Sequence, residues 1–184
     1  CHPHLVAALR AQAGELWHVS NLYHVPEQQR LAERLAAATF ADRVFLAGSG
    51  TEAVEATIKL ARRFQHAAGR PERDRILTAP HAFHGRTLGA LSATGNPAHL
   101  AGCGPRAGGF ATVDAATVEA FAGAVDERTA AILIEPVQGE GGVRPVPPAV
   151  LRGLRRLCDE HGLLLLLDEV QTGFGRTGNM YAFQ

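Results

Sequence analysis

The stretch Leu163-Leu164-Leu165-Leu166-Leu167-Asp168-Glu169-Val170-Gln171-Thr172-Gly173 decides the fold of this chain. Five consecutive leucines that end at a turn are typical of a strand buried on both faces, as in parallel sheets. Asp168 follows at the carboxyl end of the predicted strand, the edge at which open α/β sheets bind ligands. A carboxylate partly removed from water needs a cationic partner or several hydrogen-bond donors to stay ionised. We therefore expect the fold to hold a cation beside Asp168.

Apolar segments typical of strands alternate with helical patterns along the chain. Strands are predicted over residues 44–47, 75–79, 110–113, 130–134 and 163–167. Helices are predicted from Pro26 onward, over 51–68, over 115–125 behind the N-cap Asp114, and over 148–161. This alternation predicts a single α/β domain of three layers (αβα), in which helices cover both faces of a mostly parallel sheet.

The segment Gly48-Ser49-Gly50-Thr51-Glu52-Ala53 joins a predicted strand to a predicted helix. Glycines at such a turn let the backbone approach a ligand, and the helix N-terminus offers free N–H groups to an anion. The turn suits a phosphate, with the Ser49 and Thr51 hydroxyls as further donors. Its spacing also satisfies G-x-G-x-x-A of dinucleotide-binding folds, but the next strand ends without the carboxylate that binds the ribose. A capped turn without a ligand is the remaining alternative.

A second turn, His81-Ala82-Phe83-His84-Gly85-Arg86-Thr87, is predicted at the same edge of the sheet. Phe83 can stack on a flat heteroaromatic ring, and the forked guanidinium of Arg86 can hold a carboxylate. The alternative is a core phenylalanine and a solvated arginine. His81 and His84 could suggest a metal, but no further ligand cluster accompanies them, so no metal is expected.

Two carboxylates and three glycines follow the fourth predicted strand, in Ile134-Glu135-Pro136-Val137-Gln138-Gly139-Glu140-Gly141-Gly142. A strand that ends in an acid and continues as a glycine-rich loop is more typical of the wall of a binding site than of a plain connection. The alternative is a turn whose acidic side chains face solvent, above all that of Glu140.

One edge of the sheet is thus predicted to carry a phosphate cradle, an aromatic side chain, an arginine, two acids and Asp168. A ligand that matches these groups has a phosphate, a flat ring and a ring cation, and pyridoxal 5'-phosphate has all three. A carboxylate beside its pyridine nitrogen keeps that nitrogen protonated, and the protonated ring withdraws electrons from the reacting carbon.

The chain resembles the class III aminotransferases, which belong to the fold-type I pyridoxal-phosphate enzymes. The motifs that carry the resemblance span nearly the whole chain in order. They are Leu16-Trp17-His18-Val19-Ser20-Asn21-Leu22-Tyr23, Ser49-Gly50-Thr51-Glu52-Ala53, Phe83-His84-Gly85-Arg86-Thr87, Leu91-Ser92-Ala93-Thr94-Gly95-Asn96, Glu135-Pro136-Val137-Gln138-Gly139-Glu140-Gly141-Gly142 and Leu167-Asp168-Glu169-Val170-Gln171-Thr172-Gly173. The first and fourth are most similar to members that act on N-acetylornithine. Members that act on ornithine, succinylornithine or 4-aminobutyrate share most of these motifs and remain alternatives.

The resemblance implies cofactor contacts at the phosphate, on both faces of the ring, and at the ring nitrogen and hydroxyl. Gly50 and Thr51, with Ser49 alongside, would bind the phosphate. Phe83 would stack on one face of the ring and Val170 would pack on the other. The catalytic Asp168 would pair with the ring nitrogen, Gln171 would lie near the ring hydroxyl, and His84 would help to shape the site.

For the substrate, the resemblance implies that Arg86 takes the α-carboxylate and that Glu140 lines the pocket and helps to distinguish the two substrates. Glu135 would be structural. The reaction would be ping-pong transfer of an amino group from N-acetylornithine to 2-oxoglutarate, in arginine biosynthesis. The partners would be small-molecule amino acids and 2-oxo acids, and the active site would form at a homodimer interface.

Transamination needs a lysine that holds the cofactor as a Schiff base. The one lysine of the chain, Lys59, lies on a predicted helix, where a surface pair with Glu55 at i, i+4 is expected. The family's lysine would lie beyond Gln184, followed by a small carboxyl-terminal domain. We therefore expect residues 1–184 to be part of a large cofactor-binding domain, cut at both ends and inactive alone. A non-catalytic module that binds the cofactor or is purely structural is the alternative.

Composition narrows the class of protein. Lys plus Arg and Asp plus Glu both number 18, so the formal net charge is zero and nothing suggests a nucleic-acid or membrane partner. The cysteines, Cys1, Cys103 and Cys158, are odd in number and far apart, which favours a reducing compartment and a cytoplasmic enzyme. The longest apolar run is far too short to span a bilayer.

Overall fold

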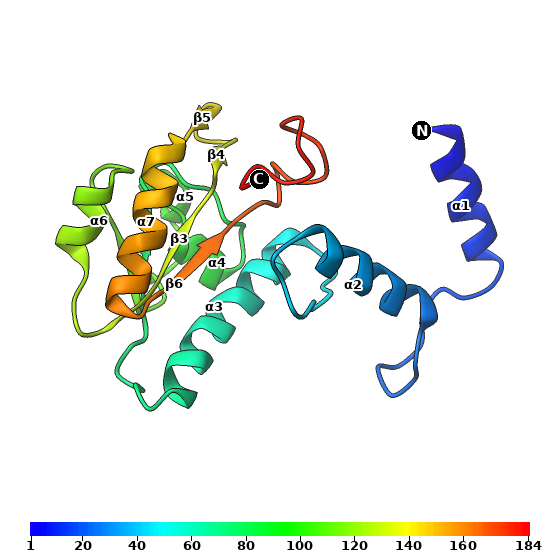
Figure 1. Ribbon diagram of the computed structural model, residues 1–184, viewed down its shortest axis with the longest axis horizontal. Coiled ribbons are helices and arrows are strands. Elements are labelled where there is room, and N and C mark those ends of the chain that lie inside the picture. The colour runs from blue at the N-terminus through cyan, green and yellow to red at the C-terminus, as the bar shows by residue number, and fades with distance from the viewer. The chain divides into compact units, whose positions relative to one another are not determined.

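The computed structural model describes residues 1–184 and contains two compact units, Cys1–Phe45 and Leu46–Gln184 (Figure 1). The first unit consists of helices α1 (Pro3–Ala13) and α2 (Pro26–Ala38) with their connecting segments. Both helices begin at a proline, whose missing N–H group costs nothing in the first turn. The predicted helix start at Pro26 is confirmed.

The second unit is built on a parallel sheet with the strand order β2-β1-β3-β6. Its strands are β1 (Arg75–Thr78), β2 (Phe110–Thr112), β3 (Thr129–Ile134) and β6 (Leu164–Leu167). β1 and β3 are central, and their residues are almost all buried. A two-stranded antiparallel ribbon, β4 (Val137–Gln138) with β5 (Arg144–Pro145), was not predicted from the sequence.

Helices cover both faces of this sheet, which confirms the predicted three-layer α/β architecture (Figure 1). α3 (Gly50–Ala67) and α4 (Leu88–Ala93) pack on one core, and α6 (Val118–Ala124) and α7 (Pro148–His161) pack on the other. The short α5 (Pro97–Leu100) follows α4. Successive residues of a strand serve opposite cores, so Ile76 packs with α3 and Leu77 with α7.

The run of leucines forms β6 at an edge of the sheet. Leu164 and Leu166 pack against one core, and Leu165 and Leu167 pack against the other. The strand is nevertheless only half-buried, because no strand lies on its outer side in this structure. The expected packing of both faces of the strand is confirmed, while its outer edge is exposed.

Two further predicted elements differ from the structure. Residues 44–47 form no strand, because they have no strand partner, and the side chain of Phe45 is 71% exposed. α6 begins at Val118, three residues after the predicted start, because the Thr117 hydroxyl rather than Asp114 accepts the N-cap hydrogen bond, from the N–H of Ala120. The helix predicted over residues 148–161 is confirmed as α7.

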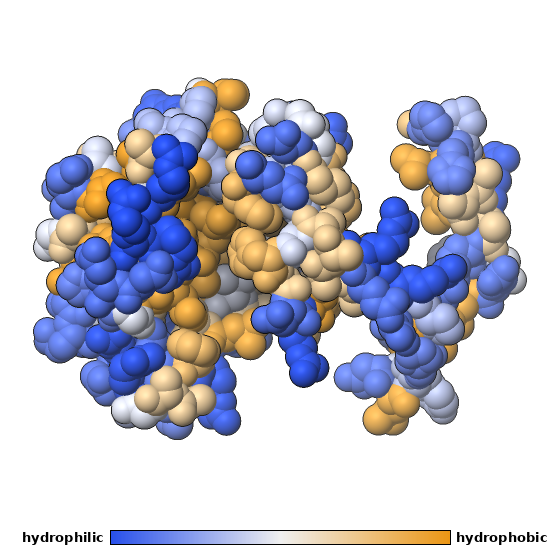
Figure 2. All heavy atoms as spheres, in the orientation of Figure 1, coloured by the Kyte–Doolittle hydropathy of each residue, from blue (hydrophilic) through white to orange (hydrophobic).

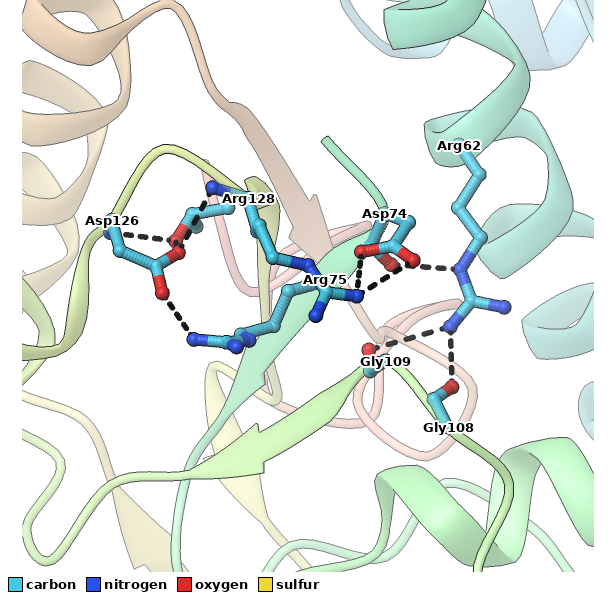
Figure 3. A network of polar contacts seen from close by, with 8 residues as sticks. Arg62, Asp74, Arg75, Gly108, Gly109, Asp126 and Arg128 are labelled. Atoms are coloured by element: carbon cyan, nitrogen blue, oxygen red, sulfur yellow. Dashed lines mark hydrogen bonds and ion pairs between the residues drawn. The ribbon is translucent and has the colours of Figure 1, made fainter. Parts of the chain in front are cut away.

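Polar side chains tie together the segments that precede the strands (Figure 3). The Arg62 guanidinium donates to the carbonyl oxygens of Asp74, Gly108 and Gly109 at 2.9–3.3 Å. Arg128 pairs with the Asp74 carboxylate, and Arg75 pairs with Asp126. These contacts hold the amino-terminal edge of the sheet together, and loops form the opposite, carboxyl-terminal edge.

Apolar side chains also reach the surface, as Figure 2 shows for one face. In the first unit the exposed ones include Leu5, Leu9, Trp17, Leu22 and Tyr23. None of the helices combines the length and the apolar character that crossing a membrane requires.

Candidate active site

A cavity opens at the carboxyl-terminal edge of the sheet in the second unit. Four segments far apart in the sequence reach it: the first turn of α3 and the loops after β1, β3 and β6. Its lining residues are Gly50, Thr51, Phe83, His84, Gly85, Glu135, Glu140, Asp168, Val170 and Gln171. The cavity therefore brings together all of the predicted site residues except Ser49 and Arg86.

The amino-terminal turn of α3 forms one end of the cavity. The Ser49 hydroxyl caps the helix, because it accepts from the N–H of Glu52 at 3.3 Å and donates to the Glu52 carboxylate at 3.2 Å. Ser49 is exposed and lies outside the cavity lining. Gly50 and Thr51 line the cavity, and as the first residues of the helix their N–H groups have no intrahelical acceptor. This end of the cavity is suited to an anion.

The opposite end is organised around Asp168, whose residue surface is 9% exposed. Its Oδ2 lies 2.7 Å from Nδ1 of His84, which is 2% exposed. Its Oδ1 accepts from the N–H of Val170 at 3.0 Å. Asp168 follows β6 directly, and its own N–H donates to the carbonyl of Ile134 in β3. The sheet and two hydrogen bonds thus fix the carboxylate.

His84 holds the Asp168 carboxylate through one ring nitrogen. Nδ1 faces the carboxylate and donates to it, while Nε2 is buried and has no hydrogen-bond partner among the protein groups. The buried carboxylate suits a cationic group of a ligand, which would favour its charged form.

Glu135 joins two walls of the cavity. Its carboxylate accepts from the N–H of Phe83 at 2.9 Å and from the N–H of Gly139 at 3.4 Å. Burial raises the pKa of Glu135, and the charge of Asp168 adds to this increase, while the two N–H groups and the neighbouring His84 oppose it. These contacts fit the structural role expected of Glu135, because they hold the Phe83 turn against the loop after β3.

Gly139 is a site residue that the sequence reasoning missed. A Cβ atom at this position would lie 1.1 Å from Oε1 of Gln171, so the Gln171 amide packs directly on the glycine backbone. Only glycine leaves the room that Gln171 needs to line the cavity. The glycine-rich loop was noticed in the sequence, but which glycine meets which side chain depends on the packing of two distant loops.

Arg86 lies beside the cavity. Its side chain is exposed, and its guanidinium carbon lies 5.9 Å from the centroid of the Phe83 ring. Arg86 lines a neighbouring hollow, and Phe83 and Glu140 line both hollows. The remaining residues of this second hollow, none of them predicted, are Leu91, His99 and Cys103.

Lys59 is exposed on α3, as expected, but its predicted surface pair with Glu55 is wrong. Oε1 of Glu55 instead accepts from the Thr87 hydroxyl at 2.5 Å and from the N–H groups of Gly89 and Ala90 at 3.1 and 3.2 Å. The i, i+4 rule assumes an exposed helix face, whereas α4 covers the face that carries Glu55.

Comparison with known proteins identifies the family. The profile of the aminotransferase class-III family matches residues 1–184. The chain belongs to the class III aminotransferases. It is 57% identical over 183 residues to the acetylornithine aminotransferase of Mesorhizobium japonicum, a match that covers 100% of this chain and 46% of that protein. The chain thus spans about half the length of the curated relatives it matches.

Solved structures agree with this class III assignment. The N-acetylornithine aminotransferase of Stenotrophomonas maltophilia K279a is 41% identical with a TM-score of 0.82, over 98% of this chain and 44% of that one. A PLP-bound amine transaminase from an uncultivated Pseudomonas species is 33% identical with a TM-score of 0.89, over 99% of this chain and 47% of that one.

Class III aminotransferases use pyridoxal phosphate, and the residues of this cavity fit that cofactor. The first turn of α3 offers backbone donors for a phosphate, and Asp168 offers a buried carboxylate for a cationic group. Phe83 and Val170 line the same cavity.

Proposed function

We propose that this chain is the cofactor-binding part of a pyridoxal-phosphate-dependent aminotransferase that acts on N-acetylornithine and 2-oxoglutarate. The observation that carries the proposal is the buried Asp168 carboxylate, oriented by His84, in a cavity that the amino-terminal turn of α3 also lines. The choice of amine rests on the relatives, of which eight at 49–57% identity are acetylornithine aminotransferases.

Each residue of the cavity then has a task toward the cofactor. Gly50 and Thr51 bind the phosphate through their N–H groups, with Ser49 holding the helix end in place. Phe83 and Val170 would contact the two faces of the ring. Pyridoxal phosphate, when bound, supplies the carbonyl group that exchanges for the amino group and a ring that withdraws electrons.

The polar residues at the other end of the cavity govern protons and orientation. Asp168 holds a proton at the pyridine nitrogen, and His84 keeps the carboxylate in place by donating to its second oxygen. Gln171, which lines the cavity, would bind the ring hydroxyl. Its position depends on the missing side chain at Gly139.

The neighbouring hollow takes the substrate. Arg86 binds the α-carboxylate with its forked guanidinium, and Glu140, which lines both hollows, distinguishes the amine from 2-oxoglutarate. Opposite charges on these two side chains suit a substrate that carries both a carboxylate and a second polar group. Glutamate formed from 2-oxoglutarate is the expected product.

The remaining parts of the enzyme complete the proposal. Residues 1–184 are part of a large domain, and the lysine that holds the cofactor and a small carboxyl-terminal domain follow Gln184. The relatives, of which the chain covers 45–46%, support this. The exposed apolar side chains of the first unit suit a homodimer interface. The enzyme would work in the cytoplasm, in arginine biosynthesis.

A substrate assay tests the proposed function. The complete protein, loaded with pyridoxal phosphate, is given 2-oxoglutarate and one amine at a time: N-acetylornithine, succinylornithine, ornithine or 4-aminobutyrate. Glutamate formation should show the highest kcat/KM with N-acetylornithine. A higher value with ornithine or 4-aminobutyrate would overturn the substrate assignment, and no glutamate with any amine would overturn the activity.

Arg86→Lys refines this assay, with Arg63→Lys on the exposed surface of α3 as the matched control. A point charge cannot replace a forked donor, so Arg86→Lys should raise KM for both amino acid substrates while Arg63→Lys leaves KM unchanged. Equal kinetics of the two variants would place Arg86 outside the substrate pocket.

A dinucleotide-dependent oxidoreductase is not favoured as an alternative. Thr78, Ala79 and Pro80 end β1 and begin the next loop, so no carboxylate stands where a ribose would need one.

A further inference from the structure

Three side chains form a continuous hydrogen-bonded chain that leads away from the phosphate end of the cavity. Oγ1 of Thr51 lies 3.3 Å from Oγ1 of Thr87, and Oγ1 of Thr87 lies 2.5 Å from Oε1 of Glu55. All three residues are partly buried. Thr51 and Glu55 stand one turn apart on the same face of α3, and Thr87 is the N-cap residue of α4. Of the three, only Thr51 lines the cavity.

The donors and acceptors give this chain a direction. Oε1 of Glu55 accepts from three groups: the Thr87 hydroxyl and the N–H groups of Gly89 and Ala90. Thr87 has one hydroxyl hydrogen and donates it to the carboxylate. Toward Thr51, the oxygen of Thr87 can therefore act only as an acceptor, and it also accepts from the N–H of Ala90 at 3.4 Å. The hydrogen bonds run from Thr51 through Thr87 to Glu55.

The two links differ in strength. The contact of 2.5 Å between Thr87 and the Glu55 carboxylate is short and charge-assisted, so it holds Thr87 firmly. The contact of 3.3 Å between Thr51 and Thr87 is longer than an ordinary hydroxyl hydrogen bond and can be exchanged at little cost. When Thr51 donates its hydrogen to a phosphate, no hydrogen remains between Thr51 and Thr87, so packing must then keep the Thr51 side chain in the same place.

Packing on the other side of Thr51 completes the restraint. A Cβ atom at Gly85 would lie 2.3 Å from Oγ1 of Thr51, and the φ angle of Gly85 is 122°. Glycine alone tolerates both conditions, so the Thr51 hydroxyl sits between the backbone of Gly85 and the hydroxyl of Thr87. The rotamer of Thr51 is set by a turn that also carries Phe83 and by a carboxylate that lies outside the cavity.

We propose that Glu55 is a positioning residue of the phosphate-binding turn: it fixes Thr87 and the first turn of α4, so that Thr87 and the Gly85 backbone confine the Thr51 side chain to the rotamer that presents its hydroxyl to the cofactor phosphate. This inference rests on the proposed function, because it needs pyridoxal phosphate in the cavity. It assigns a role in cofactor affinity to two residues that do not touch the cavity, Glu55 and Thr87.

The test compares pyridoxal phosphate with pyridoxal, which lacks the phosphate. Dissociation constants of both are measured by absorbance titration of the complete apoprotein, for the unaltered protein and for Glu55→Ala, Thr87→Val and Thr87→Ser. Lys59→Ala is the matched control, because Lys59 lies on the same helix and is exposed. We expect Glu55→Ala and Thr87→Val to weaken pyridoxal phosphate about tenfold while pyridoxal binding stays within twofold, and Thr87→Ser and Lys59→Ala to bind like the unaltered protein.

Thr87→Val leaves the Glu55 contacts with the backbone of α4 in place but removes the hydroxyl that caps α4. Thermal unfolding of each variant is therefore measured beside the two dissociation constants, and a loss of pyridoxal phosphate binding alone marks positioning. As a further check, Thr51→Val should abolish the effect of Glu55→Ala when the two are combined. Equal weakening of both ligands would overturn the inference in favour of a purely structural role for Glu55, as would unchanged binding in both variants. Unaltered protein that binds neither ligand would instead overturn the proposed function.

Discussion

Nδ1 of His84 lies 2.7 Å from Oδ2 of Asp168, and both side chains are buried at the carboxyl-terminal edge of the sheet. Nδ1 donates to the carboxylate and so fixes the orientation of Asp168. A buried carboxylate held in this way at the carboxyl-terminal edge of the sheet suits a cationic group of a ligand.

Replacement of His84 tests the orientation of this carboxylate. His84→Ala removes a hydrogen bond to a charged group, which is worth about 1.5–3 kcal/mol, and should weaken cofactor binding and lower kcat. His84→Asn keeps an N–H donor near the place of Nδ1 and should restore part of both losses. Cofactor titration and steady-state kinetics of the complete protein measure these effects. Equal losses in the two variants would show that His84 acts through its volume alone.

Gly139→Ala tests the contact between the loops after β3 and β6. The new methyl group overlaps the Gln171 amide, and the expected cost of such overpacking is about 1–3 kcal/mol, with weaker cofactor binding because Gln171 must move. Gly123→Ala is the matched control, because a Cβ atom there meets nothing within 4 Å and α6 should gain up to about 1 kcal/mol. Thermal unfolding and cofactor titration measure both. A Gly139→Ala variant with unchanged stability and unchanged cofactor affinity would contradict the packing of Gln171 on Gly139.

The pH dependence of stability tests the burial of Glu135. Because burial raises its pKa in the folded state, folding favours the protonated carboxyl. The contribution of Glu135 to the free energy of unfolding is fully present below its ordinary pKa. It is lost as the pH rises through the raised pKa of the folded state. Glu135→Gln, which keeps an acceptor for the N–H of Phe83, should not lose stability in this way.

Urea unfolding at a series of pH values from 4 upward should show the Glu135→Gln variant gaining on the unaltered protein as pH rises. The relevant quantity is the difference in unfolding free energy between the two proteins at each pH. A difference that stays constant, or that shrinks with rising pH, would show that Glu135 is not held in a raised-pKa environment.

The cysteines offer a simple chemical test of the core. Burial raises the pKa of Cys158 to about 11, and its side chain packs in the core that α6 and α7 cover, whereas Cys1 and Cys103 are exposed. Because the thiolate is the reactive form, a maleimide at pH 8 should modify Cys1 and Cys103 quickly and Cys158 only after unfolding. Mass spectrometry of the digested chain reads this out. Rapid native labelling of Cys158 would contradict the packing of α7.

Local pattern was sufficient for much of this fold. α7 was predicted with its observed bounds, because its apolar face repeats at helical spacing and Leu154, Leu157 and Cys158 are indeed buried. The four strands of the parallel sheet were predicted correctly from short apolar runs. The strand predicted over residues 44–47 is wrong, because an apolar run becomes a strand only when another strand pairs with it, and pairing is not a local property.

For the site, too, local sequence pattern predicted one part and contacts between distant segments decided the rest. Its cavity collects residues that the sequence placed at the ends of strands, because the carboxyl ends of parallel strands meet at one edge. The roles of Glu55 and Gly139 could not be predicted, since each depends on a contact between segments more than 30 residues apart. Spacing along one helix paired Glu55 with Lys59, and the fold paired it with Thr87 instead.

The most direct test of the proposed cofactor site is the protonation state of the pyridine nitrogen. Pyridoxal phosphate labelled with ¹⁵N in the ring is bound to the complete protein, and its NMR shift is recorded near neutral pH. The shift should be that of a protonated nitrogen in the unaltered protein and that of an unprotonated one in Asp168→Asn. An unprotonated nitrogen in the unaltered protein, or the same shift in both, would contradict the assignment of Asp168.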